Sequence, residues 1–143
     1  MKTINDNCDK QVLKVIRALK QWNQRPYRIG MPSYLIETMI SDYYHSLFTT
    51  FGTSIISEYL DLEVIKVFEY LKNNIYHNVN DPKGIASNIN TLSWDDKFSL
   101  QQRLATDWDK AKSARQYEQD DNHAASIKKW SEIFGENFPT YTG

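Results

Sequence analysis

The stretch from residue 33 to residue 48 constrains the fold most, because its apolar residues recur at helical spacing without a gap. They form one wide stripe: Leu35, Ile36, Met39, Ile40, Tyr43, Tyr44, Leu47 and Phe48. Pro32 and Ser33 open this stretch as a helix start, and Gly52 marks a break after it. A stripe this wide is typical of a helix buried at the centre of a bundle. With only five Gly and four Pro in 143 residues, turns should be few and the regular structure helical.

Four other segments show helical spacing. The pattern predicts helices over residues 11–24, 56–76, 94–119 and 123–134. Asp9 and Ser93 are the expected N-caps of the first and the long fourth segment, and Gly135 is expected to end the last one. Pro26 should stop the first helix, and the Asn-rich stretch 78–91 should form a loop.

Two of these segments carry specific expectations about the buried face. In the fourth segment one side should hold Trp94, Phe98, Gln101, Leu104, Trp108, Ala111 and Arg115. In the last, the inward residues should be Ala124, Ile127, Trp130, Ile133 and Phe134. No alternating strand pattern and no internal repeat is present. We therefore expect an all-α fold, a single helical bundle of about five helices forming one domain over residues 1–143, with an ordered core at about 9–139.

Composition and motifs exclude several function classes. Seventeen basic against 18 acidic residues give a net charge of -1, which argues against a general nucleic-acid coat protein. The single Cys8 excludes a disulfide framework and fits a reducing compartment. No stretch is long enough for a membrane span and residues 1–6 lack the apolar core of a secretion signal, so we expect a cytoplasmic protein with no membrane partner.

The sequence holds no metal-site pattern and no glycine-rich phosphate loop. Its histidines are scattered over different elements, at His45, His77 and His123. Gly52-Thr53-Ser54 followed by Asp61-Leu62-Glu63 imitates the turn and paired acids of polymerase-β-type nucleotidyltransferases. Those acids must project together from a strand, whereas here they fall in a helical pattern that turns residues two apart away from each other. We therefore interpret them as a solvated helix start and expect no metal site and no catalytic residue.

The charge distribution is more informative than the net charge. From residue 10 to residue 36 there are six basic residues and no acidic one: Lys10, Lys14, Arg17, Lys20, Arg25 and Arg28. Elsewhere acids outnumber bases 18 to 11. A cationic helix followed by a helix N-terminus at Ser33 is suited to bind a phosphate, because free N–H groups and the helix dipole favour an anion there. A basic, solvated helix face would explain the same composition.

Two segments carry a resemblance to a known family. Leu19-Lys20-Gln21-Trp22-Asn23-Gln24, a short loop, and then Met31-Pro32-Ser33-Tyr34-Leu35-Ile36-Glu37 resemble the helical lobe of template-independent nucleotidyltransferases. These enzymes include 2′-5′ oligoadenylate synthetase, cyclic GMP-AMP synthase and the bacterial cyclases of antiphage signalling. Asp81-Pro82 before the Asn-rich loop, the long helix with Ala111 and Ala114, and the run from Ala125 to Phe138-Pro139 extend the resemblance to about residues 11–139.

The resemblance implies a nucleotide-binding role. In the family, the lysine that corresponds to Lys20 contacts the triphosphate of the bound nucleotide. The serine that corresponds to Ser33 also contacts phosphate, and the tyrosine that corresponds to Tyr34 stacks on the base. An ammonium and a helix-start hydroxyl bond phosphate oxygens well, and an aromatic ring stacks on any base. Plainer interpretations are a solvated lysine, an N-cap serine and a tyrosine that packs the second helix on the first. We assign Trp22 to the core.

The family's catalytic half, with its sheet and Mg²⁺-binding acids, has no counterpart in these residues. The resemblance therefore implies the C-terminal lobe of a second-messenger nucleotidyltransferase, which binds ATP- or GTP-class nucleoside triphosphates and works with an N-terminal catalytic core in cis or in trans. It implies no cofactor in this chain and no turnover by the lobe alone, with Mg²⁺ held only by the other half.

Two other functions are compatible with parts of the sequence. A stand-alone interaction module would use the wide stripe of residues 35–48 as an exposed patch for a protein partner. A single-stranded RNA binder would use Tyr34, Tyr43 and Tyr44, but these share the face of the core stripe and the net charge disfavours it.

Overall fold

The computed structural model describes residues 6–24, 30–52, 55–85 and 87–135, and these fold into five helices without a strand. In chain order they are α1 (Asp6–Asn23), α2 (Ser33–Phe51), α3 (Leu60–Asn74), α4 (Trp94–Gln119) and α5 (His123–Phe134). The all-α prediction is confirmed.

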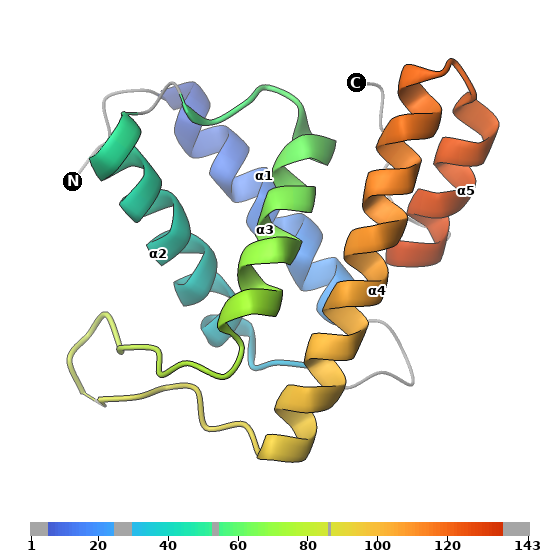
Figure 1. The fold of residues 1–143 in the computed structure, drawn as a ribbon. Coiled ribbons are helices and arrows are strands. Elements are labelled where there is room, and N and C mark those ends of the chain that lie inside the picture. Colours follow the sequence, from blue (N-terminus) through green and yellow to red (C-terminus); the bar gives the residue numbers. More distant parts are fainter. Residues whose placement is uncertain (1–5, 25–29, 53–54, 86, 136–143) are drawn as a thin grey trace.

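The helices form two groups that meet along α4 (Figure 1). α1, α2 and α3 pack together on one side, and α4 and α5 form an antiparallel hairpin on the other. α4 lies between α3 and α5, while α1 also contacts α5. The end of α1 is joined to the approach to α2 by hydrogen bonds between the Asn23 side chain and the Met31 backbone.

The observed helix ends differ from the predicted ones mainly in α1 and α3. α1 begins at Asp6, so Asp9 lies inside the helix and is not its N-cap. α1 ends at Asn23, and Pro26, its predicted stop, lies outside the described residues. α3 begins at Leu60 rather than near residue 56, because the segment before it is held in an irregular turn by polar contacts described below.

The predicted start of α4 and the predicted ends of α2 and α5 are confirmed, whereas α3 ends at Asn74, two residues before its predicted end. The Ser93 hydroxyl caps α4 by accepting from the Asp96 N–H at 3.1 Å. Asp121, at a φ of 61°, ends that helix, and the Asn122 side chain caps α5. Gly52 and Gly135 stand at the ends of α2 and α5 with φ of 83° and 92°, a backbone region that glycine enters without strain.

The loop between α3 and α4 is fixed by asparagine side chains. Asn90 is buried, and its amide donates to the backbone oxygens of Ile75 at 2.7 Å and His77 at 2.9 Å. The Asn88 side-chain oxygen accepts from the N–H groups of Val79 and Asn90. These bonds satisfy the backbone at the end of α3, so the Asn-rich composition supports an ordered loop.

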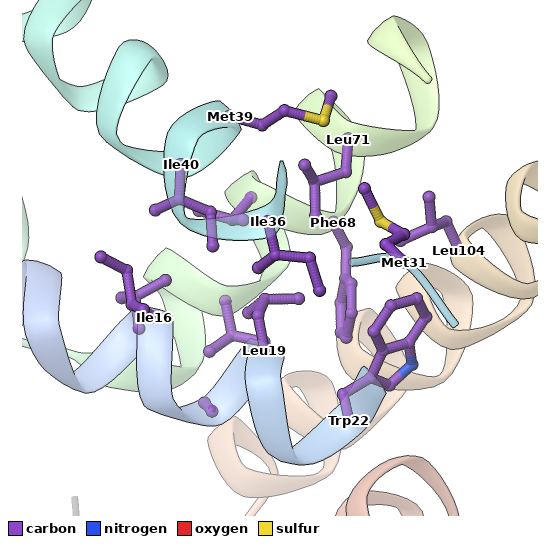
Figure 2. Close-up of a cluster of buried hydrophobic side chains, with 14 of the residues drawn as sticks. Ile16, Leu19, Trp22, Met31, Ile36, Met39, Ile40, Phe68, Leu71 and Leu104 are labelled. Carbon is purple, nitrogen blue, oxygen red and sulfur yellow. The ribbon is translucent and has the colours of Figure 1, made fainter. Parts of the chain in front are cut away.

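The core lies where α1, α2, α3 and α4 converge (Figure 2). Ile16 and Leu19 of α1 face Ile36 and Ile40 of α2, and the Phe68 ring of α3 lies between this group and Trp22. Trp22 is fully buried, as predicted, beside Met31 and Leu104. Burying these side chains supplies the main stabilisation of the bundle, about 1.5–3 kcal/mol for each large one.

The predicted buried faces of α4 and α5 are partly wrong. In α4, Trp94 and Phe98 are 72% and 58% exposed. In α5, Ile127 is 58% exposed, and Ala124 is exposed as well. The observed inward residues of α4 are Leu100, Arg103, Leu104, Asp107, Ala111 and Ala114. The prediction was right for Leu104 and Ala111, but it missed Arg103 and Asp107 because these buried residues are charged and do not stand out as part of an apolar stripe.

Candidate functional site

Lys20 lies in the last turn of α1 and reaches across to α2. Its ammonium is 3.0 Å from the Glu37 carboxylate, and the two side chains are 34% and 46% exposed. Ser33 precedes Glu37 by one helical turn and Tyr34 precedes it by three residues, so all three share one side of α2. The ion pair therefore holds the Lys20 ammonium beside the first turns of α2.

Ser33 is the first residue of α2, directly after Pro32. Pro32 occupies the cap position and no side-chain hydrogen bond caps this helix, so the interpretation of Ser33 as an N-cap is wrong. The first N–H groups of a helix carry its positive dipole end, and Ser33 is an exposed residue at this end of α2. This geometry is of the kind that binds phosphate oxygens in proteins.

Tyr34 is 55% exposed, which leaves a large part of its ring available to a ligand. A tyrosine that only packed α2 against α1 would be covered by both helices. Lys20 lies in the last turn of α1, and Ser33 and Tyr34 lie in the first turn of α2. We call the region where α1 ends and α2 begins the α1–α2 corner.

Asn23 closes this corner. Its side-chain amide donates to the Met31 oxygen at 2.7 Å, and its side-chain oxygen accepts from the Met31 N–H at 2.6 Å. Gly30 packs so closely that a Cβ there would lie 3.0 Å from Asn23 Oδ1 and 3.1 Å from the Asn23 carbonyl oxygen. The end of α1 and the approach to α2 are thereby tied together at a fixed distance. The sequence motif contained Asn23, but its spacing gave no sign of this contact.

Trp22 anchors the same turn to α4. Its indole Nε1–H donates to Asp107 Oδ2 at 2.6 Å, and the Arg103 guanidinium lies 3.9 Å from the ring centroid. Arg103 also donates to the Trp22 carbonyl oxygen. The Phe68 ring packs edge-on at 5.5 Å.

The paired acids of α3 are buried, which contradicts the interpretation as a solvated helix start. Asp61 and Glu63 are 5% and 1% exposed. Asp61 pairs with Arg115 of α4 at 2.9 Å. They point to different partners and not toward a shared site, as expected for residues two apart on a helix.

Glu63 is the centre of a buried polar cluster. It accepts from the Tyr44 hydroxyl at 2.8 Å, the Ser57 N–H at 3.0 Å and the Lys66 ammonium at 3.2 Å. Burial, and then the Glu63 charge, raises the pKa of Tyr44 well above its usual value and that of Tyr43 to about 12. Both hydroxyls thus stay protonated at neutral pH, and that of Tyr44 serves as a hydrogen-bond donor to Glu63.

The structure adds two negative findings for the described part of the chain. No three His, Cys, Asp or Glu side chains there come together as ligands for a metal ion. None of the helices there combines the length and apolar character needed to cross a lipid bilayer. The α2 stripe proposed as an exposed patch is instead largely in the core, where Leu35, Ile36, Met39, Ile40 and Tyr44 are buried.

The structure is thus an all-α bundle in which Lys20, in the last turn of α1, pairs with Glu37 of α2. No protein-family model matches the chain. It is 34% identical over 138 residues to a protein named probable cyclic nucleotide synthase from Bacillus cereus (strain VD146). The match covers 96% of this chain but 39% of that protein, so the chain spans about two-fifths of its relative's length. The chain is thus related to a protein named as a cyclic nucleotide synthase, in agreement with the resemblance seen in the sequence.

Proposed function

We propose that this chain is the helical lobe of a nucleotidyltransferase that makes a cyclic or linear oligonucleotide messenger, and that its α1–α2 corner binds the incoming nucleoside triphosphate. The relative named as a cyclic nucleotide synthase supports the reaction class. The observation that carries the proposal is the ion pair that holds the Lys20 ammonium against Glu37 of α2, the helix whose first turn carries Ser33 and the exposed Tyr34. Bacterial antiphage signalling and a cytoplasmic location belong to the same proposal.

Each residue has a distinct role in this site. Lys20 exchanges its Glu37 partner for the triphosphate, because a multiply charged anion attracts an ammonium more strongly than one carboxylate does. The Ser33 hydroxyl and the N-terminal N–H groups of α2 donate to phosphate oxygens. The Tyr34 ring stacks on the base, which is worth about 1–3 kcal/mol.

The lobe contributes binding and substrate choice, while nucleotidyl transfer belongs to a catalytic half that would act in cis or in trans. The buried acids Asp61 and Glu63 are committed to Arg115, Tyr44 and Lys66, and so they do not bind Mg²⁺ in this lobe. The catalytic half would bind Mg²⁺ and orient the attacking hydroxyl. Nucleotide therefore binds weakly to the lobe alone.

An NMR titration with ATP tests this proposal. We expect shifts of the amide signals of residues 19–23 and 33–37 at millimolar ATP, with smaller shifts for adenosine. Lys20→Met should weaken ATP binding about tenfold, the effect of losing about 1.4 kcal/mol. Tyr34→Ala should weaken ATP and adenosine alike.

The matched control is Lys14→Met, which removes an exposed lysine of the same helix and the same amount of charge. It should change ATP affinity less than twofold, a loss within about 0.4 kcal/mol. Equal weakening of ATP binding in the two lysine variants would mean that the affinity depends only on the net charge of the protein. Absence of ATP-dependent shifts in the unchanged protein would refute nucleotide binding at this corner.

A further inference from the structure

Arg103 and Asp107 are two oppositely charged residues buried one turn apart on α4. They are 8% and 1% exposed, and both contact Trp22 of α1. Trp22 follows Lys20 by two residues and precedes Asn23. The charged pair therefore acts on the same helical turn that carries the nucleotide-binding corner.

The contacts fix the turn in more than one direction. Asp107 accepts from the edge of the indole, and the Arg103 guanidinium covers its face. Arg103 also donates to the Trp22 backbone oxygen, one of the carbonyls that a helix leaves unpaired at its C-terminal end. Together they determine both the rotation of the side chain and the position of the backbone.

Burying two charged residues in this way contributes less to the stability of the fold than apolar residues would. Moving two charges out of water costs several kcal/mol for each, and apolar side chains of similar size often give equal or greater stability. What charged groups add is orientation, because a hydrogen bond to a charge is short and directional. A second oxygen of Asp107, Oδ1, has no hydrogen-bond partner among the described residues, so satisfying that carboxylate does not explain its burial there.

We propose that Arg103 and Asp107 are positioning residues for nucleotide binding, which set the last turn of α1 so that the Lys20 ammonium meets the phosphates beside Ser33. This inference rests on the proposed function. Neither side chain touches the nucleotide; each acts through Trp22. Their removal should therefore impair the recognition of phosphate more than that of base and ribose.

The ratio of ATP to adenosine affinity is the diagnostic measurement, taken by NMR titration on the full chain. Partial unfolding lowers both affinities by the same factor and leaves the ratio unchanged. Asp107→Leu should weaken ATP binding about tenfold, the effect of losing about 1.4 kcal/mol, with adenosine changed less than twofold. Asp107→Asn keeps an acceptor for the indole and should recover most of the ATP affinity.

Two further variants keep the test decisive. Arg103→Met should reproduce the effect of Asp107→Leu, and it replaces that variant if Asp107→Leu does not fold. Asp109→Asn, at a site 73% exposed on the same helix, is the matched control and should leave the ratio unchanged. An unchanged ratio in both Asp107→Leu and Arg103→Met would overturn the inference while leaving ATP binding intact.

Failure of the proposed function gives a different result. If the unchanged protein binds no ATP, the nucleotide proposal falls, and amide hydrogen exchange then tests the positioning. Loss of protection confined to residues 19–23 in Arg103→Met would support a local positioning role. Uniform loss over all five helices would show that the pair only stabilises the fold, and would overturn the inference.

Discussion

The polar cluster around Glu63 and the corner around Lys20 both contain charged residues, but these residues differ in how far they are exposed to solvent. Glu63 is 1% exposed and accepts from three donors at 2.8–3.2 Å. Lys20 is 34% exposed and pairs with Glu37, which is itself 46% exposed. An acid enclosed by fixed donors is committed to the fold, whereas an ammonium with one solvated partner remains able to bind a ligand. Solvent exposure thus distinguishes Glu63, a charge that stabilises the fold, from Lys20, the charge that we propose binds a ligand.

The energies expected for the two regions differ accordingly. Removing one partner of a buried, hydrogen-bonded charge costs about 3–5 kcal/mol, because the remaining groups are left without water or partner. Removing one partner of an exposed pair costs about 0–1 kcal/mol, because water replaces the lost contact. Stability measurements on single variants can therefore test the distinction directly.

The largest effect is expected for Glu63→Ala. It leaves the Tyr44 hydroxyl and the Ser57 N–H without their acceptor and should lower the free energy of unfolding by about 3 kcal/mol. Urea denaturation measures this change. Glu69→Ala, at an exposed position of the same helix, should stay within about 0.5 kcal/mol. Equal effects in the two variants would remove the basis for calling the Glu63 cluster structural.

Local spacing predicted the helices well but missed the role of the buried acids. Each helix was recognised from apolar residues that lie close in sequence, and capping residues located several of its ends. The partners of Asp61 and Glu63 are Arg115 and Tyr44, which are 54 and 19 residues away and invisible to such a pattern. One signal was available: Asp61 lies on the same face as Val64 and so continues the apolar stripe of α3.

The same limit applies to the candidate site. Lys20, Ser33 and Tyr34 were predicted as site residues because they stand in a recognisable motif, and they remain a prediction. Glu37 stands in that motif too, yet its contact with Lys20 depends on how α1 crosses α2. Arg103 and Asp107 lie more than 80 residues from Trp22, and their polarity hid the inward face of α4. Each of these contacts depends on long-range packing, which a local sequence pattern does not predict.

Asn23→Ala provides an intermediate case at the corner. It removes two hydrogen bonds to Met31, each worth about 0.5–1.5 kcal/mol, at a half-buried position. We expect the free energy of unfolding to fall by about 1–2 kcal/mol, as measured by urea denaturation. Asn78→Ala, at an exposed loop position, should be close to neutral. A neutral Asn23→Ala would mean that the corner is held by packing alone.

A smaller effect on stability is expected for Lys20→Met. Its ion pair with Glu37 is exposed, so the free energy of unfolding should change by less than about 1 kcal/mol. Thermal and urea denaturation check this. The variant therefore separates binding from folding: a large loss of stability would place Lys20 with Glu63 among the structural charges, and the proposed division between the two regions would fail.

The smallest effect on stability is expected for the exposed pair of His123 and Glu118, which should change the pKa of His123 but hardly the free energy of unfolding. A hydrogen bond to the Glu118 carboxylate at 2.8 Å, and then the charge of that carboxylate, raise the pKa of His123. Since the folded pKa lies above the unfolded one, the stabilising contribution is complete below the unfolded pKa, about 6.5, and is lost as the pH rises through the folded pKa. An NMR titration of the His123 ring in Glu118→Gln should show a lower pKa than in the unchanged protein.

Glu58→Gln, which removes an exposed acid that does not contribute to the raised pKa of His123, is the control for this titration and should leave that pKa unchanged. A similar decrease in both variants would show that the histidine senses only net charge. A decrease confined to Glu118→Gln would show that an exposed pair can bias protonation while adding little to stability. Lys20 and Glu37 form a pair of the same kind, and such a pair can exchange one partner for a ligand without loss of the fold.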